Sequence, residues 1–199
     1  LLPLVRIQDL IKPSLSQYEL YEDQLTNIKD DRIVYSSESL GYLLNEISPL
    51  LGTLRLLQNL VIKLVKAKGV NSLPKSINDY IKKPAPHKLD KKLHDAIINH
   101  WDSTGNNLKS YRDIDQHYQW LISRYFLQFS PRRTVLIEFP DNPEVKSPKK
   151  FKYDQKINGI DFLNESFKEI HILVATIAEF YAARETPHQQ GLLMEQLGF

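Results

Sequence analysis

The residues best suited to chemistry stand together in one short segment, 111–118, whose sequence is YRDIDQHY. It combines a guanidinium, two carboxylates, an amide, an imidazole and two phenols. If the segment is helical, Asp113 and His117 lie one turn apart on the same face. The carboxylate is then placed to accept a hydrogen bond from one imidazole nitrogen, which leaves the other to take up a proton. The spacing predicts a general base and the side chain that orients it.

Arg112 precedes His117 by five residues, which separates the two side chains by about 140° around a helix. They converge if the helix start frays, if the long arginine side chain wraps across the helix, or if a symmetric dimer supplies one of them from a second copy. The alternative is structural, with Arg112 paired to Asp115 or Gln116 on a solvated helix face.

The order Arg112, Asp113 and, after three intervening residues, His117 resembles the Arg-[Asn, Asp or His]-x-x-x-His signature of the HEPN superfamily. Many of its members are helical-bundle, metal-independent endoribonucleases, in which the arginine and histidine of each protomer meet in a dimer cleft. The resemblance implies that Arg112 contacts the scissile phosphate and that His117 acts on the ribose 2′-hydroxyl or the leaving group. It implies that Asp113 holds the local polar network and that no cofactor is needed. Tyr118, one position from a tyrosine that some members carry, is a candidate binding residue.

A second group of candidate binding residues is basic and surrounds an expected β-hairpin over 133–155. The hairpin is expected because 134–139 is β-branched and aromatic, 141–148 is rich in turn residues and 151–153 alternates again. Interleaved aromatic residues suit this hairpin to contacts with nucleic-acid phosphates and bases. The alternative is that its lysines only protect a strand edge, and the salt dependence of RNA binding separates the two. The candidate phosphate contacts are Arg132, Arg133, Lys149, Lys150 and Lys152.

Composition and motifs exclude several kinds of chemistry. The chain has 199 residues and no cysteine, which removes disulfides, thiol nucleophiles and thiolate metal sites. Glycine-rich phosphate loops, H-E-x-x-H and G-x-S-x-G are also absent from the sequence. The net charge of +2 is too small to indicate nucleic acid by itself. His94 and His100 fall on different helix faces, which favours structural roles over a metal site, and His171 is expected to be packed.

Hydrophobic periodicity predicts the elements that must position these residues. Pro49 lies inside the strongest apolar stripe, where it either kinks one helix or opens a second. An interruption is expected at 105–107, within helical spacing that continues to 129. The expected segments are a first helix from Ser14 or Ser16, a helix over 40–65 ending at Gly69, a proline-containing connector over 70–86, helical structure over 87–129 and a last helix over 158–184.

These patterns predict a single all-α domain over 1–199, a bundle of four to five main helices with the β-hairpin as an insertion. No stretch is long and apolar enough to span a bilayer and the first residues do not resemble a signal peptide, so a cytoplasmic protein without membrane association is expected. The expected function is RNA cleavage by a homodimer, with a protein partner or antitoxin as a further candidate partner. The rival is a non-catalytic protein-interaction module that binds its partner through 120–129 or 160–181, with Arg112 and His117 structural.

Overall fold

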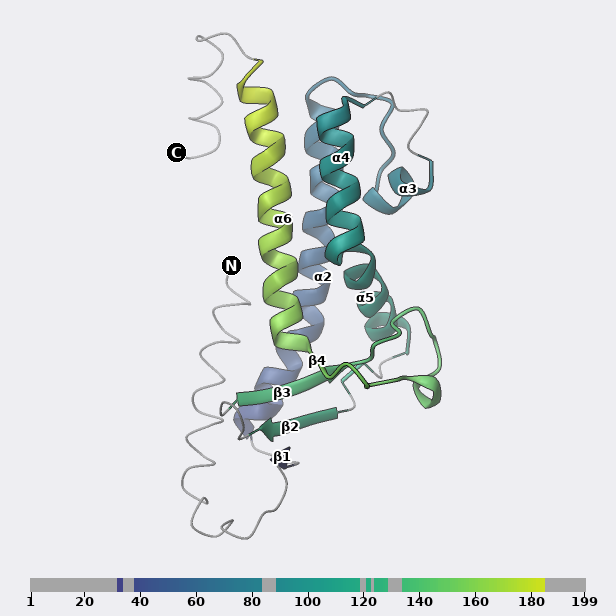
Figure 1. Ribbon diagram of the computed structural model, residues 1–199, viewed down its shortest axis with the longest axis vertical. Coiled ribbons are helices and arrows are strands. Elements are labelled where there is room, and N and C mark those ends of the chain that lie inside the picture. Colours follow the sequence, from purple (N-terminus) through teal and green to yellow (C-terminus); the bar gives the residue numbers. More distant parts are fainter. Residues whose placement is uncertain are drawn as a thin grey trace. The chain divides into compact units, whose positions relative to one another are not determined.

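The computed structural model describes residues 32–33, 38–83, 89–118, 121–122, 124–128 and 134–184 (Figure 1). These residues are mostly helical with a small antiparallel sheet, which confirms the coarse prediction of a helical fold with a hairpin. The expected first helix from Ser14 or Ser16 lies outside them. The elements are β1 (Arg32–Ile33), α2 (Glu38–Ala67), α3 (Ile77–Lys82), α4 (Lys91–His100), the π-helical turn η3 (Trp101–Gly105), α5 (Asn106–Tyr118), β2 (Arg124–Gln128), β3 (Thr134–Phe139), the 3-10 turn η4 (Pro148–Lys150), β4 (Ile157–Asn158) and α6 (Gly159–Ala182).

The chain folds into two compact units, which we call the sheet unit and the helical unit. The sheet unit comprises the described residues up to 55 and those within 106–166, and the helical unit comprises the described residues within 56–105 and from 167 onward. Because α2 and α6 each continue across a unit boundary, both units draw on the same two long helices. Strands β1 to β4, helix α5 and the described candidate site residues belong to the sheet unit. None of the helices in the described ranges has the length and apolar character needed to cross a bilayer.

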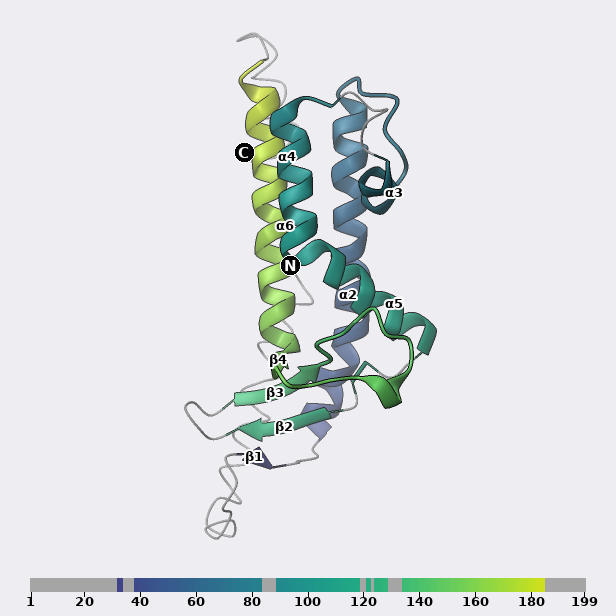
Figure 2. The ribbon, with the colours of Figure 1, turned by 45° about the vertical axis from the view of Figure 1, so that its right-hand side comes forward.

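The helical unit is held together by apolar side chains that recur at three- and four-residue steps on its helices. Leu93 and Ile97 of α4 share one buried cluster with Leu173 and Ile177 of α6. Figure 2 shows α4 running beside α6 in this unit. The interruption expected at 105–107 lies earlier than predicted: the π-helical turn η3 (Trp101–Gly105) separates α4 from α5, and Asn106 and Asn107 already belong to α5.

The apolar stripe over 40–65 forms one helix, α2, rather than two. Pro49 lies inside it, where the missing N–H removes one backbone hydrogen bond, and Thr53 Oγ1 donates to the Pro49 carbonyl at 2.8 Å. Beyond its end Gly69 has a φ of 102°, the left-handed conformation that commonly follows a helix. Within the expected connector, α3 begins where the Ser76 hydroxyl accepts a hydrogen bond from the Asp79 N–H at 3.1 Å.

The sheet of the sheet unit has the order β1-β2-β3-β4, and each neighbouring pair is antiparallel. In the β2–β3 ladder Arg124 lies opposite Glu138 and Leu127 lies opposite Val135. Because side chains alternate along a strand, Arg124 and Phe126 point to one face of the sheet and the buried Leu127 points to the other.

Two predictions for this region are wrong in detail. Helical structure does not continue to 129, since 124–128 forms strand β2. The sequence RYFLQ favours strands through its aromatic residues, and its pairing with β3 outweighs the helical spacing. The first strand of the hairpin is confirmed at 134–139, but its return strand is 157–158 and not 151–153, so the insertion does not have the bounds 133–155. Residues 151–153 lie in a loop instead of a strand. The Lys152 N–H donates a hydrogen bond to Asn142 Oδ1, and the Lys152 carbonyl accepts one from the Asp141 N–H.

Gly159 begins α6 against the ring of Phe139, and a Cβ added there would lie 2.7 Å from Phe139 Cδ1. We expect Gly159→Ala to lower the free energy of unfolding by about 1–3 kcal/mol, as overpacked sites do. Gly52 of α2 is the matched control, because an added Cβ meets nothing within 4 Å. Gly52→Ala is expected to raise the free energy of unfolding by about 0.5–1 kcal/mol. Urea unfolding measures both, and equal effects would contradict the close packing at Gly159.

Candidate functional site

Helix α5 carries the candidate catalytic residues, and a buried stripe fixes its orientation. The Tyr111 ring lies 4.8 Å from the Phe139 ring and 4.9 Å from the Phe162 ring, between centroids. Its hydroxyl donates a hydrogen bond to the Pro140 carbonyl at 2.8 Å. Burial raises the pKa of the Tyr111 hydroxyl, which therefore stays protonated as a donor. The stripe consists of Leu108, Tyr111 and Ile114.

Asp113 is the centre of a small ionic network on α5. Its carboxylate accepts hydrogen bonds from Lys109 Nζ at 2.7 Å and from Arg112 Nη1 at 3.3 Å. Burial by itself raises the pKa of this carboxyl, but the hydrogen bonds and positive charges of Lys109 and Arg112 outweigh it and hold the pKa below its usual value. Arg112 thus pairs with the residue that follows it, while Asp115 accepts a hydrogen bond from Ser48 of α2 at 2.6 Å.

The lowered pKa of Asp113 predicts a small loss of stability in acid. A carboxyl with a depressed folded pKa stabilises the fold above its unfolded pKa, about 3.9, and loses this contribution as the pH falls through the folded value. Because the side chain is 35% exposed, solvent screening limits the effect to about 1 kcal/mol or less. We expect Asp113→Asn to be less stable than the native chain in urea near neutral pH and equally stable near pH ~2. A difference of the same size at both pH values would contradict the ionic pairing.

His117 and Asp113 line the same pocket of about 500 Å³ in the sheet unit. Helix α5 supplies one side of the pocket and the loop between β3 and β4 supplies the other. His117 is exposed, so its imidazole is accessible to a substrate. The pocket gathers this imidazole, the two carboxylates of Asp113 and Glu144 and the two amines of Lys109 and Lys146, so it offers a proton acceptor together with cationic contacts for an anion. The lining residues are Asn106, Lys109, Ser110, Asp113, Ile114, His117, Pro143, Glu144 and Lys146.

The structure brings together only part of the predicted site. Arg112 is not among the residues that line the pocket, and its side chain, 32% exposed, lies against Asp113. Tyr118 is the last residue of α5, but its side chain is outside the described residues, and so are Arg132 and Arg133. Among the residues that the structure describes, the lining of the pocket includes His117 but no guanidinium.

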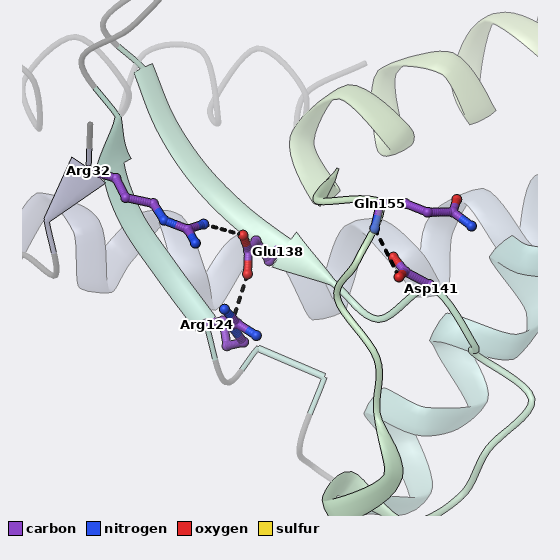
Figure 3. A network of polar contacts seen from close by, with 5 residues as sticks. All are labelled: Arg32, Arg124, Glu138, Asp141 and Gln155. Carbon is purple, nitrogen blue, oxygen red and sulfur yellow. Dashed lines mark hydrogen bonds and ion pairs between the residues drawn. The ribbon is translucent and has the colours of Figure 1, made fainter. Parts of the chain in front are cut away.

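The loop 140–156 between β3 and β4 is held by two side chains near its start. Asn142 Nδ2 donates to the Lys150 carbonyl at 3.0 Å, and Asn142 Oδ1 accepts from the Lys152 N–H at 2.9 Å. Asp141 accepts a hydrogen bond from the Gln155 N–H at 3.0 Å (Figure 3). The predicted phosphate contacts Lys149, Lys150 and Lys152 are thus exposed on a loop with a fixed backbone.

Three further histidines of the described ranges lie outside the pocket. His100 is buried and its Nε2 lies 3.0 Å from Gln58 Nε2, while His94 Nδ1 lies 2.7 Å from the Tyr80 hydroxyl. Both imidazoles thus have a side-chain partner within the fold. The prediction that His171 is packed is wrong, because the buried stripe of α6 falls on neighbouring positions and leaves His171 exposed. Within the described ranges, no three acidic or histidine side chains gather as a metal site requires.

The positions of Lys109 and Lys146 in the pocket, and a second set of charged residues, were not predicted from the sequence. Lys109 precedes Asp113 by one helical turn, so the spacing of opposite charges was a usable signal. The place of Lys146 in the pocket has no local signal, because it depends on how the loop folds. The second set is Arg32, Glu138 and Arg124 on three neighbouring strands, which only strand pairing brings together (Figure 3).

Comparisons of this chain with protein-family models, with curated proteins and with solved structures found no match.

Proposed function

We propose that the protein is a metal-independent endoribonuclease of the HEPN type. The observation that carries the proposal is the pocket in which His117 and Asp113 stand with Lys109 and Lys146. An imidazole can move a proton near neutral pH, and lysines can offset the charge of a phosphate, so the pocket needs no metal ion for this chemistry. The HEPN-like order of Arg112, Asp113 and His117 supports the same reaction.

In the proposed reaction His117 accepts the proton of a ribose 2′-hydroxyl. The 2′ oxygen attacks the adjacent phosphorus, the O2′–P bond forms and the P–O5′ bond breaks. The departing 5′ oxygen takes a proton from water, which leaves a 2′,3′-cyclic phosphate and a 5′-hydroxyl. Lys146 and Arg112 offset the charge that grows on the phosphate oxygens, and Asp113 orients Lys109 and Arg112.

Arg112 lies beside the pocket and is not among its lining residues. A second copy of the chain could supply the arginine that the proposed reaction needs. In a two-fold symmetric dimer the same helix occurs twice, and we propose that Arg112 of one copy enters the His117 pocket of the other. Each active site then combines residues of both protomers.

Mixing two inactive variants tests this shared site. Arg112→Ala and His117→Ala are each expected to be inactive alone, while refolding an equimolar mixture recovers roughly a quarter of the native activity. About half of the dimers are then mixed, and each mixed dimer has one intact site out of two. The measurement is the initial rate of RNA cleavage. Mixed dimers that form but recover no activity would contradict the shared site.

The proposed function is tested with an RNA that lacks the attacking group. The native protein is incubated in excess EDTA with a labelled single-stranded RNA, and in parallel with the same sequence carrying 2′-O-methyl groups. We expect cleavage of the first and none of the second, because only the first has a free 2′-hydroxyl. Cleavage of both, or of neither, would contradict the proposal.

A second candidate is a protein-interaction module, which exposed apolar residues of the helical unit favour. Leu56 and Leu60 lie one turn apart on α2 and are 55% and 42% exposed, and Ile172 of α6 is 56% exposed. Such residues are common in binding surfaces for protein partners. Absence of RNA cleavage, together with partner binding that Leu56→Glu abolishes and His117→Ala retains, would favour this candidate.

A further inference from the structure

Flat side chains follow one another on one face of the sheet, and we call this set the stacking column. The Arg32 guanidinium lies 4.7 Å from the centroid of the Phe126 ring. The Arg124 guanidinium lies 5.9 Å from the same ring and 4.4 Å from the ring of Tyr153. Arginine, phenylalanine, arginine and tyrosine therefore alternate, and cation–π attraction favours this arrangement.

Glu138 fixes the two arginines of the stacking column. Its carboxylate lies 2.6 Å from Arg32 Nη1 and 2.9 Å from Arg124 Nε, and its side chain is only 1% exposed (Figure 3). The arginine side chains are 28% and 38% exposed, so the buried carboxylate holds two guanidiniums that solvent still reaches. The two arginines contribute two positive charges and Glu138 contributes one negative charge, so the stacking column and Glu138 together carry a net charge of +1.

The chemistry of the stacking column matches that of a single-stranded nucleic acid. Bases stack on aromatic rings and on guanidinium planes, and every base has a face that can do so. A guanidinium has five N–H groups. Glu138 contacts one nitrogen of each arginine, so the other nitrogens of Arg32 and Arg124 can donate hydrogen bonds to phosphate oxygens. The charged guanidiniums disfavour a hydrophobic partner at this surface, and their positive charge repels a metal ion.

One loop connects the stacking column to the pocket of His117. Loop 140–156 lines that pocket through Pro143, Glu144 and Lys146, and it places Tyr153 on Arg124. The exposed lysines 149, 150 and 152 lie between these two points of the loop. Both features belong to the sheet unit, so the same strand of RNA can follow the loop from one to the other.

We propose that the stacking column binds the bases of single-stranded RNA next to the nucleotide that is cleaved. This inference rests on the proposed function and names how its substrate is held. Because Glu138 arranges the guanidiniums in advance, a base meets a prepared surface and little side-chain ordering is needed on binding.

The test measures binding without cleavage, so that the two proposals can fail separately. A fluorescein-labelled 2′-O-methyl RNA of mixed sequence is titrated with the native protein in EDTA and followed by anisotropy. We expect Tyr153→Leu to weaken binding roughly 5- to 100-fold, the loss of one stacked base, and Tyr153→Trp to retain the native affinity. Tyr42→Leu is the matched control, because Tyr42 is a 55% exposed tyrosine of the same unit and is not one of the four residues of the column.

Photocrosslinking gives a second readout that does not depend on a variant. RNA carrying 5-iodouridine is irradiated with the native protein, and mass spectrometry is expected to place the crosslink on Phe126 or Tyr153. Native affinity of Tyr153→Leu, crosslinks confined to other peptides, or no binding by the native protein would each overturn the stacking column. If any of these results is obtained but unmodified RNA is still cleaved, the proposed function stands and only the stacking column is wrong. If RNA binds at the column but is not cleaved, the column stands and the proposed function is wrong.

Discussion

Replacing His117 by alanine is expected to lower the rate of RNA cleavage by about 100- to 10,000-fold, the usual contribution of a general acid or base. The reason is that His117 is the imidazole of the pocket formed by α5 and loop 140–156. Because His117 is exposed, its truncation removes little packing, and the thermal unfolding temperature is expected to stay close to that of the native protein. The measurement is the initial rate with a labelled single-stranded RNA in excess EDTA.

His171→Ala is the matched control for this substitution. His171 is also an exposed histidine on a helix, but it belongs to the helical unit and not to the pocket. We expect the native cleavage rate for His171→Ala. Equal rates for the two variants, whether both high or both low, would remove His117 from the reaction.

Replacing Glu138 by alanine is expected to lower the free energy of unfolding by about 2–4 kcal/mol. Removing one partner from a buried ion pair commonly costs about 3–5 kcal/mol, because the remaining charge keeps its desolvation without its partner. Here the two remaining charges, on Arg32 and Arg124, are partly exposed and regain some hydration. We therefore expect a loss of stability somewhat smaller than for a fully buried pair. The effect is measured by urea unfolding near neutral pH.

Glu179→Ala is the control for the loss of an acidic side chain. Glu179 is exposed on α6, and substitutions at such positions usually change stability by about 0.5 kcal/mol or less. If Glu138→Ala were as harmless as Glu179→Ala, the carboxylate would not be what holds the two arginines on the sheet.

The sequence predicts the helices well because their apolar residues repeat over many turns. The stripe from Leu40 to Val65 lies on one continuous helix, and the expected break in the next helical segment is a π-helical turn at 101–105, shared with the predicted 105–107 only at Gly105. Short elements are harder to predict, because a few apolar residues fit two periods. The segment 124–128 fits helical spacing, yet its pairing with β3 makes it a strand. The return strand at 157–158 has two residues, too few to show any alternation.

Part of the candidate site follows from local spacing and part does not. Asp113 and His117 line one pocket, as expected of residues one turn apart on a helix. Arg112 lies outside that pocket's lining, as its rotation of about 140° from His117 already suggests. Lys146 and the stacking column depend on strand pairing and on the hydrogen bonds of loop 140–156, which join residues far apart in the sequence.

The chemical ends of the RNA products test the central claim most directly. Native protein in excess EDTA is incubated with a defined single-stranded RNA, and the products are identified by mass spectrometry. The proposed mechanism predicts 2′,3′-cyclic phosphate and 5′-hydroxyl ends, because the 2′ oxygen is the attacking group. Products with 3′-hydroxyl and 5′-phosphate ends, or intact RNA after incubation with folded protein, would contradict it.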